Sequence, residues 1–135
     1  MNVLIVDSDG AQREQLIEVM AWFGIVEAVL QADRLAAIGA IAQRTSIAVV
    51  LVGEVDDASQ GEVLREIPRL LPEARRIAYN ALDLATSTML HDAGAEVVFD
   101  RRMSNWKAAL VLRPLFWDAP PPVLPDVTTA AYSTY

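Results

Sequence analysis

The chain alternates between short, continuous apolar runs and longer segments in which apolar residues recur at helical spacing. The run Val3 to Val6 is entirely apolar and branched, which is typical of a strand buried on both faces of a parallel sheet. The segment that follows places Leu16, Ile17, Met20 and Phe23 three or four positions apart. This spacing gives a helix one apolar side. The opening residues therefore predict a buried strand followed by an amphipathic helix.

The same strand-and-helix pattern occurs five times along the chain. Such alternation predicts a parallel sheet with helices on both of its faces, which is a doubly wound α/β fold in three layers. We expect Ser104 to cap the last helix and Pro114 to shorten or kink it. Gly94 stands where a helix C-terminal glycine belongs. The predicted strands are 3–6, 25–30, 47–52, 76–79 and 97–99, and the predicted helices are 11–23, 32–44, 60–71, 84–93 and 104–116.

The composition changes from Asp118 onward, where four prolines occur in the seven residues 119–125. Proline-rich sequence favours an extended chain over a packed element. We therefore expect one domain over residues 1–117 and a tail or linker over residues 118–135.

Charge and composition exclude several classes of function. The net charge of −7 would repel a phosphate backbone, so this chain by itself is predicted not to bind nucleic acid. It has no cysteine for disulfides or thiolate metal sites, and no apolar run long enough for a membrane span. The N-terminus lacks the features of a signal peptide. We therefore expect a cytoplasmic protein without a membrane association.

Side chains that could carry chemistry are expected directly after the strands, because ligands of doubly wound sheets bind at the carboxyl ends of the strands. Asp7 and Ser8 follow the first predicted strand, and Gly53 and Glu54 follow the third. Asn80 follows the fourth, and Asp100, Arg101 and Arg102 follow the fifth. The sequence contains no phosphate-binding glycine loop and no nucleophile with a paired base. We therefore predict no enzyme activity, no catalytic residue and no cofactor.

Four segments together resemble the receiver domain of two-component response regulators, over roughly residues 2–116. They are VLIVDSD at the first strand, VVLVGEV at the third, IAYNA at the fourth and HDAGAEVVFDR around the fifth. The resemblance implies a flavodoxin-like sheet with strand order 2-1-3-4-5. It also implies a site in which three carboxylates bind Mg²⁺ and one of them accepts a phosphoryl group. A hydroxyl residue and a lysine assist at that site.

This sequence departs from the receiver pattern at most of those positions. Asp7 matches the first residue of the acidic pair, but Ser8 takes the place of the second. The phospho-acceptor position falls on Gly53, with Glu54 one residue later. Asn80 replaces the hydroxyl residue and Arg101 replaces the lysine. Because one carboxylate is a poor ligand set for Mg²⁺, we predict no metal site and a pseudo-receiver that is not phosphorylated in the usual way.

The resemblance also implies a switch residue and an interaction face. The aromatic switch position falls on Val98, which cannot swing a ring. The family's dimer face is formed by the fourth helix, the fifth strand and the fifth helix. There we expect Trp106, Leu110 and Leu112 to contribute apolar area, with Trp106 equally suited to the core.

Several side chains have a structural interpretation beside the functional one. Asp7 is expected to form an ion pair with Arg101, since a buried charge needs a partner. Glu54 is either a solvated loop residue or a built-in mimic of phosphate. Asp56 and Asp57 are predicted to be solvated loop residues. The single histidine, His91, is expected on the surface without a metal role.

The predicted function is therefore signalling by protein–protein interaction or homodimerisation, without phosphorylation, in control of an effector that is commonly transcriptional. One alternative is a receiver phosphorylated at an unusual acid, such as Glu54 or Asp56. Another is a domain that senses a small anion or metabolite through Arg101 and Arg102. A thermal shift on adding ligand would identify the latter.

Overall fold

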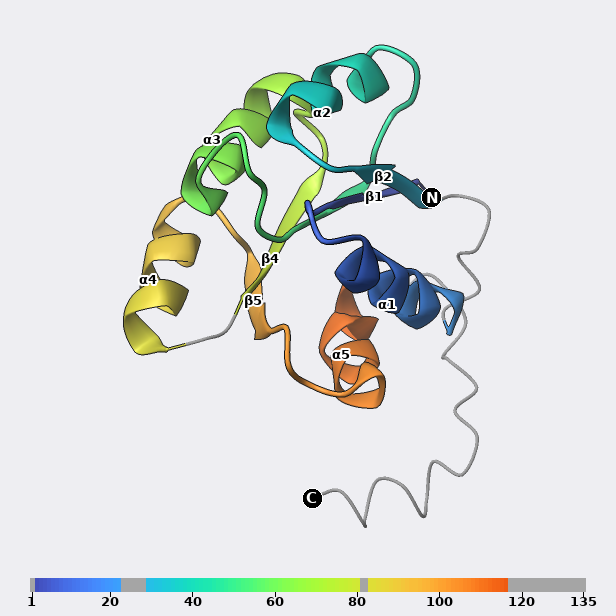
Figure 1. Cartoon of the computed structure of the whole chain (residues 1–135), viewed down its shortest axis with the longest axis vertical. Helices are drawn as coiled ribbons and strands as arrows, with labels where there is room; N and C mark the ends of the chain where they lie inside the picture. The colour runs from blue at the N-terminus through green and yellow to red at the C-terminus, as the bar shows by residue number, and fades with distance from the viewer. Residues whose placement is uncertain (1, 23–28, 81–82, 117–135) are drawn as a thin grey trace.

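The computed structural model describes residues 2–22, 29–80 and 83–116 of the chain (Figure 1). Strands and helices alternate through these residues, as the apolar pattern predicts. The strands are β1 (Val3–Val6), β2 (Val29–Ala32), β3 (Val49–Val52), β4 (Arg75–Asn80) and β5 (Val97–Asp100). The helices are α1 (Gly10–Ala21), α2 (Leu35–Ala42), α3 (Gln60–Leu70), α4 (Leu84–Asp92) and α5 (Asn105–Leu112), followed by a short 3-10 turn η1 (Arg113–Phe116).

The five strands form one parallel sheet in the order β2-β1-β3-β4-β5, which confirms the predicted topology. β1 lies between β2 and β3, and Val6 pairs with both Ala32 and Val52. The order reverses direction at β1, so the carboxyl ends of β1 and β3 border the topological switch point. Ligands of doubly wound sheets bind at this place.

Alternate residues of each strand contribute to two separate hydrophobic cores, because successive side chains of a strand point to opposite faces. Figure 1 shows α1 and α5 side by side on one face of the sheet and α2, α3 and α4 on the other. Val3 and Ile5 pack with Leu16 of α1 and Leu112 of α5 in the first core. The second core contains Leu4 and Val6 together with Ile38, Leu64 and Leu90 of the other three helices.

Several boundaries differ by a few residues from the sequence-based prediction. The second strand continues to Ala32, two residues beyond the predicted end at Leu30, because residues 29–32 pair with β1 over its full length. The following helix consequently begins at Leu35 instead of Ala32. Residues 25–28 and the predicted tail 118–135 lie outside the described residues. The turn at Arg113–Phe116 contains Pro114, in agreement with the predicted shortening of the last helix.

Side chains that precede the helices fix where most of them begin. Asp9, Ser59, Asp83 and Ser104 each accept a hydrogen bond from a backbone N–H of the first turn of α1, α3, α4 and α5. Gly94, predicted to end α4, has a φ of 116°, which favours glycine. Within residues 2–22, 29–80 and 83–116, no helix is long and apolar enough to cross a membrane.

Candidate functional site

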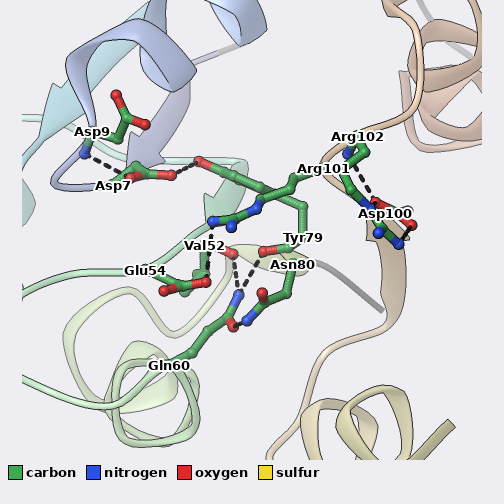
Figure 2. Close-up of polar contacts among 10 residues, drawn as sticks. All are labelled: Asp7, Asp9, Val52, Glu54, Gln60, Tyr79, Asn80, Asp100, Arg101 and Arg102. Atoms are coloured by element: carbon green, nitrogen blue, oxygen red, sulfur yellow. Dashed lines mark hydrogen bonds and ion pairs between the residues drawn. The ribbon is translucent and has the colours of Figure 1, made fainter. Parts of the chain in front are cut away.

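The carboxyl ends of β1, β3 and β4 bring a small group of polar side chains together, drawn in Figure 2. Asp7 directly follows β1 and is 5% exposed, although it is a carboxylate. Its Oδ2 accepts a hydrogen bond of 2.9 Å from the Tyr79 hydroxyl of β4, and its Oδ1 accepts one of 2.8 Å from the Asp9 backbone N–H. Gly53 follows β3, between the two strands that carry this pair.

Burial governs the ionisation of both members of this pair. Removal from water raises the pKa of the Asp7 carboxyl above its ordinary value, and the hydrogen bonds from Asp9 and Tyr79 oppose that rise. The pKa of the Tyr79 phenol is also raised, first by burial and then by the neighbouring Asp7 charge. The phenol therefore stays protonated and donates its hydrogen to the carboxylate.

Gln60 and Asn80 form a second polar link, between the ends of β3 and β4. The side-chain Nε2 of Gln60, the first residue of α3, donates to the carbonyl oxygens of Val52 at 2.8 Å and Tyr79 at 2.9 Å. Its Oε1 accepts a hydrogen bond of 2.7 Å from Asn80 Nδ2. Gln60 is buried, so these bonds satisfy an amide that would otherwise be costly to bury. The position that resembles the hydroxyl switch therefore holds a strand-to-helix link.

Hydrogen bonds also join the loops after β1, β2 and β3. The Ser8 hydroxyl donates to the Asp33 carbonyl oxygen at 2.8 Å and accepts from the Asp56 backbone N–H at 3.0 Å. The Asp57 carboxylate accepts from the backbone N–H groups of Leu35 and Ala36, at 2.8 and 3.1 Å. These bonds hold the pKa of Asp57 below its ordinary value. Asp57 is exposed, as predicted, but it also caps α2 from a different loop.

The ion pair predicted between Asp7 and Arg101 is wrong. Arg101 Nη1 lies 3.2 Å from Glu54 Oε1, while Asp7 is hydrogen-bonded to a phenol. Arg101 and Glu54 are both partly exposed, so they meet at the solvent side of the site (Figure 2). Asp7 is buried, and the Tyr79 hydroxyl takes the place that an arginine would need. Arg102 pairs with Asp100, whose pKa it lowers to about 2. Both arginines proposed as anion ligands are thus already paired with acids.

The residues predicted for the interaction face lie at different depths. Leu112 is fully buried against the sheet, so it contributes to the core and not to a surface. Trp106, Leu110 and Val98 are half-buried. The sequence prediction did not include the two large apolar side chains of α4 that are exposed, Leu84 at 83% and Met89 at 45%.

The residues at this edge do not fit the magnesium site that the resemblance implies. Mg²⁺ requires several oxygen ligands in a near-octahedral arrangement. Asp7 supplies one carboxylate, and both of its oxygens already accept hydrogen bonds. Within the described residues, no three acidic, histidine or cysteine side chains are grouped closely enough to hold a metal ion.

Sequence reasoning missed Tyr79 and Gln60, the two side chains that join the strand ends. Tyr79 appears in the sequence only as the end of a predicted strand, and Gln60 only as the start of a predicted helix. One signal was present, since a glycine at the end of β3 leaves room for a large side chain on a neighbouring strand. The identity of that neighbour depends on the strand order and register.

No family model matches the sequence, and no curated protein matches it either. Solved structures of receiver domains do share its fold. A CheY-like response regulator receiver domain protein from Methanospirillum hungatei is 18% identical, with a TM-score of 0.70 over 87% of this chain and 94% of that one. The beryllofluoride-activated NtrC4 receiver domain dimer is 15% identical, with a TM-score of 0.73 over 87% and 96%. A LuxR-family two-component response regulator from Aurantimonas is 13% identical, with a TM-score of 0.70 over 99% and 98%.

Proposed function

We propose that this chain is a receiver-type signalling domain that acts through protein–protein contact without an aspartyl phosphate. The fold is that of response regulator receiver domains, which supports a place in signal transduction. One observation carries the rest of the proposal. The space at the acceptor position, beside Gly53, is taken by the hydrogen-bonded Tyr79 hydroxyl and Asp7 carboxylate.

Phosphoryl transfer to a carboxylate requires an acceptor oxygen facing a pocket and a cation to neutralise the incoming charge. Gly53 offers no side chain, and Asp7 is engaged by Tyr79 and Asp9. Glu54, the acid that follows Gly53 in the sequence, is exposed and paired with Arg101. At this edge of the sheet, the acids that could accept a phosphoryl group are therefore already engaged by neighbouring side chains or backbone groups.

Treatment with acetyl phosphate and Mg²⁺ tests this proposal directly. We expect the intact mass and the backbone amide spectrum of the protein to stay unchanged. A covalent phosphoryl adduct would overturn the proposal. The variant Glu54→Gln with Asp56→Asn then separates the alternatives, because an adduct lost in this variant would identify phosphorylation of an unusual acid.

The surface of α4 is the proposed site of contact, with a second copy of the chain as the partner. Leu84 and Met89 expose apolar area on one short helix, and Leu90 is its one fully buried side chain among the described residues. The two side chains are five positions apart, about 140° around the helix, so the proposed contact centres on Leu84, the more exposed of the two. Half-buried Val98, Trp106 and Leu110 of β5 and α5 belong to the face predicted beside it. Control of a transcriptional effector would follow from pairing two such domains.

Sedimentation over a range of concentrations tests the proposed surface. Leu84→Glu places a charge at the centre of the proposed contact, and we expect it to shift a dimer of the wild-type chain toward monomer. Ala40→Glu is the matched control, since Ala40 is exposed on α2, which lies in the same helix layer but is separated from α4 by α3. A wild-type protein that stays monomeric throughout, or equal effects of the two variants, would contradict a dimer through α4.

A further inference from the structure

Asp7, Gly53 and Tyr79 belong to the same face of the sheet. Alternate residues point the same way, so Asp7 continues the row of Val3 and Ile5, which faces α1 and α5. Tyr79 lies in that row on β4, and its ring packs against Phe99 with 5.5 Å between centroids. The side chain of Tyr79 therefore starts in the apolar core, and its hydroxyl ends at the polar edge.

The hydroxyl of Tyr79 passes over the end of β3 to reach Asp7. β3 lies between β4 and β1 in the sheet, and the register pairs Val52 with Ala78. One residue further along, Gly53 comes beside Tyr79. Neighbouring strands are about 4.8 Å apart, so a tyrosine on β4 can bridge to β1 only if the residue between them leaves room. Figure 2 shows the phenol extended toward Asp7 in this way.

A side chain at position 53 would collide with both partners of the hydrogen bond. A Cβ placed on Gly53 would lie 2.2 Å from Asp7 Oδ2, 2.6 Å from the Tyr79 hydroxyl oxygen and 2.7 Å from Tyr79 Cζ. Real Cβ atoms essentially never come within 3.0 Å of such neighbours. Asp7 and Tyr79 are both buried, which leaves them little freedom to move aside.

We propose that Tyr79 is a built-in plug, an internal ligand of Asp7 that fills the acceptor space and holds the edge of the sheet in one closed conformation. This inference rests on the proposed function and names the side chain that keeps the site from being phosphorylated. Gly53 and Tyr79 then act as one pair, because the glycine creates the opening that the phenol fills. No metal or phosphate is needed to join β1 and β4 at this edge.

A double-mutant cycle on thermal unfolding tests the plug. Gly53→Ala alone should lower the unfolding midpoint by roughly 5–10 °C, since overpacking a rigid interior is destabilising. Tyr79→Leu keeps an apolar body in the core but lacks the outer ring atoms and the hydroxyl. In the Tyr79→Leu background the Asp7 carboxyl can turn into the space that the ring vacates, so adding Gly53→Ala should lower the midpoint by much less than it does in wild type. Equal losses in both backgrounds would overturn the proposal.

Two further variants separate crowding from the hydrogen bond and from a general effect of glycine. Tyr79→Phe retains Cζ, so Gly53→Ala should remain destabilising in that background, and relief there would contradict a steric plug. Gly39→Ala is the matched control, because nothing lies within 4 Å of a Cβ at that helical position. It should raise the midpoint slightly and equally in all backgrounds.

The double-mutant cycle and the phosphodonor experiment test the plug and the proposed function separately. If the effects of the two substitutions simply add and the wild type is not phosphorylated, the plug is overturned and the proposed function stands. A phosphoryl adduct on the wild type would remove the proposed function, whatever the cycle shows.

Discussion

Replacing Gln60 with an apolar residue should lower the free energy of unfolding, because its buried amide joins β3, β4 and α3. The amide makes three hydrogen bonds in a buried place, two donated to the ends of β3 and β4 and one accepted from Asn80. A net contribution of about 0.5–1.5 kcal/mol for each of the three bonds gives a loss of about 2–4 kcal/mol for Gln60→Leu. At roughly 4 °C per kcal/mol for a domain of this size, the midpoint should fall by about 8–16 °C.

An isosteric variant distinguishes hydrogen bonding from packing. Gln60→Glu keeps the shape but turns a carboxylate oxygen toward two carbonyl oxygens. Burial and this repulsion should raise the pKa of the introduced acid in the folded state. A raised folded-state pKa means that the penalty is largest above that pKa and shrinks as pH falls through it toward the unfolded value.

Urea unfolding of the three proteins between pH 5 and 8 measures these effects. Gln43→Leu is the control, since this glutamine is exposed at the end of α2 and should change stability by less than about 0.5 kcal/mol. The reasoning would be refuted by a Gln60→Leu protein as stable as the control, or by a Gln60→Glu penalty that does not depend on pH.

Three further predictions concern groups with shifted ionisation. The raised pKa of Asp7 means that wild type should gain stability relative to Asp7→Asn as pH falls through the folded-state value, and a difference independent of pH would contradict this. The raised pKa of Tyr79 means that stability should decline above the unfolded value of 10.0, where only the unfolded chain ionises, and that Tyr79→Phe should decline less in alkaline urea titrations. The lowered pKa of Asp57 means that Asp57→Ala should be less stable than wild type at neutral pH, with the gap closing as acid protonates the wild-type carboxylate; a gap that persists in acid would argue against the α2 cap.

The sequence alone determined the architecture, because the apolar pattern of each strand and helix can be recognised within a few consecutive residues. Four-residue apolar runs such as Val3–Val6 and Val49–Val52 indicate strands buried on both faces, and alternation with helices leaves few possible topologies. The sequence also placed Asp7, Gly53 and Asn80 at the ends of strands. It could not place the end of β2, since the strand is partly exposed and polar at Gln31, and its last residue is set by pairing with β1.

Only the tertiary structure decided which of these strand-end residues meet. Tyr79 and Asp7 are 72 positions apart and belong to strands that are not neighbours, so their hydrogen bond depends on the order β1-β3-β4 and on the glycine between them. The same holds for Arg101, whose charge suits either Asp7 or Glu54, and which pairs with Glu54 because Tyr79 already satisfies the buried acid. Residue types limit which bonds are possible, and long-range packing selects among them.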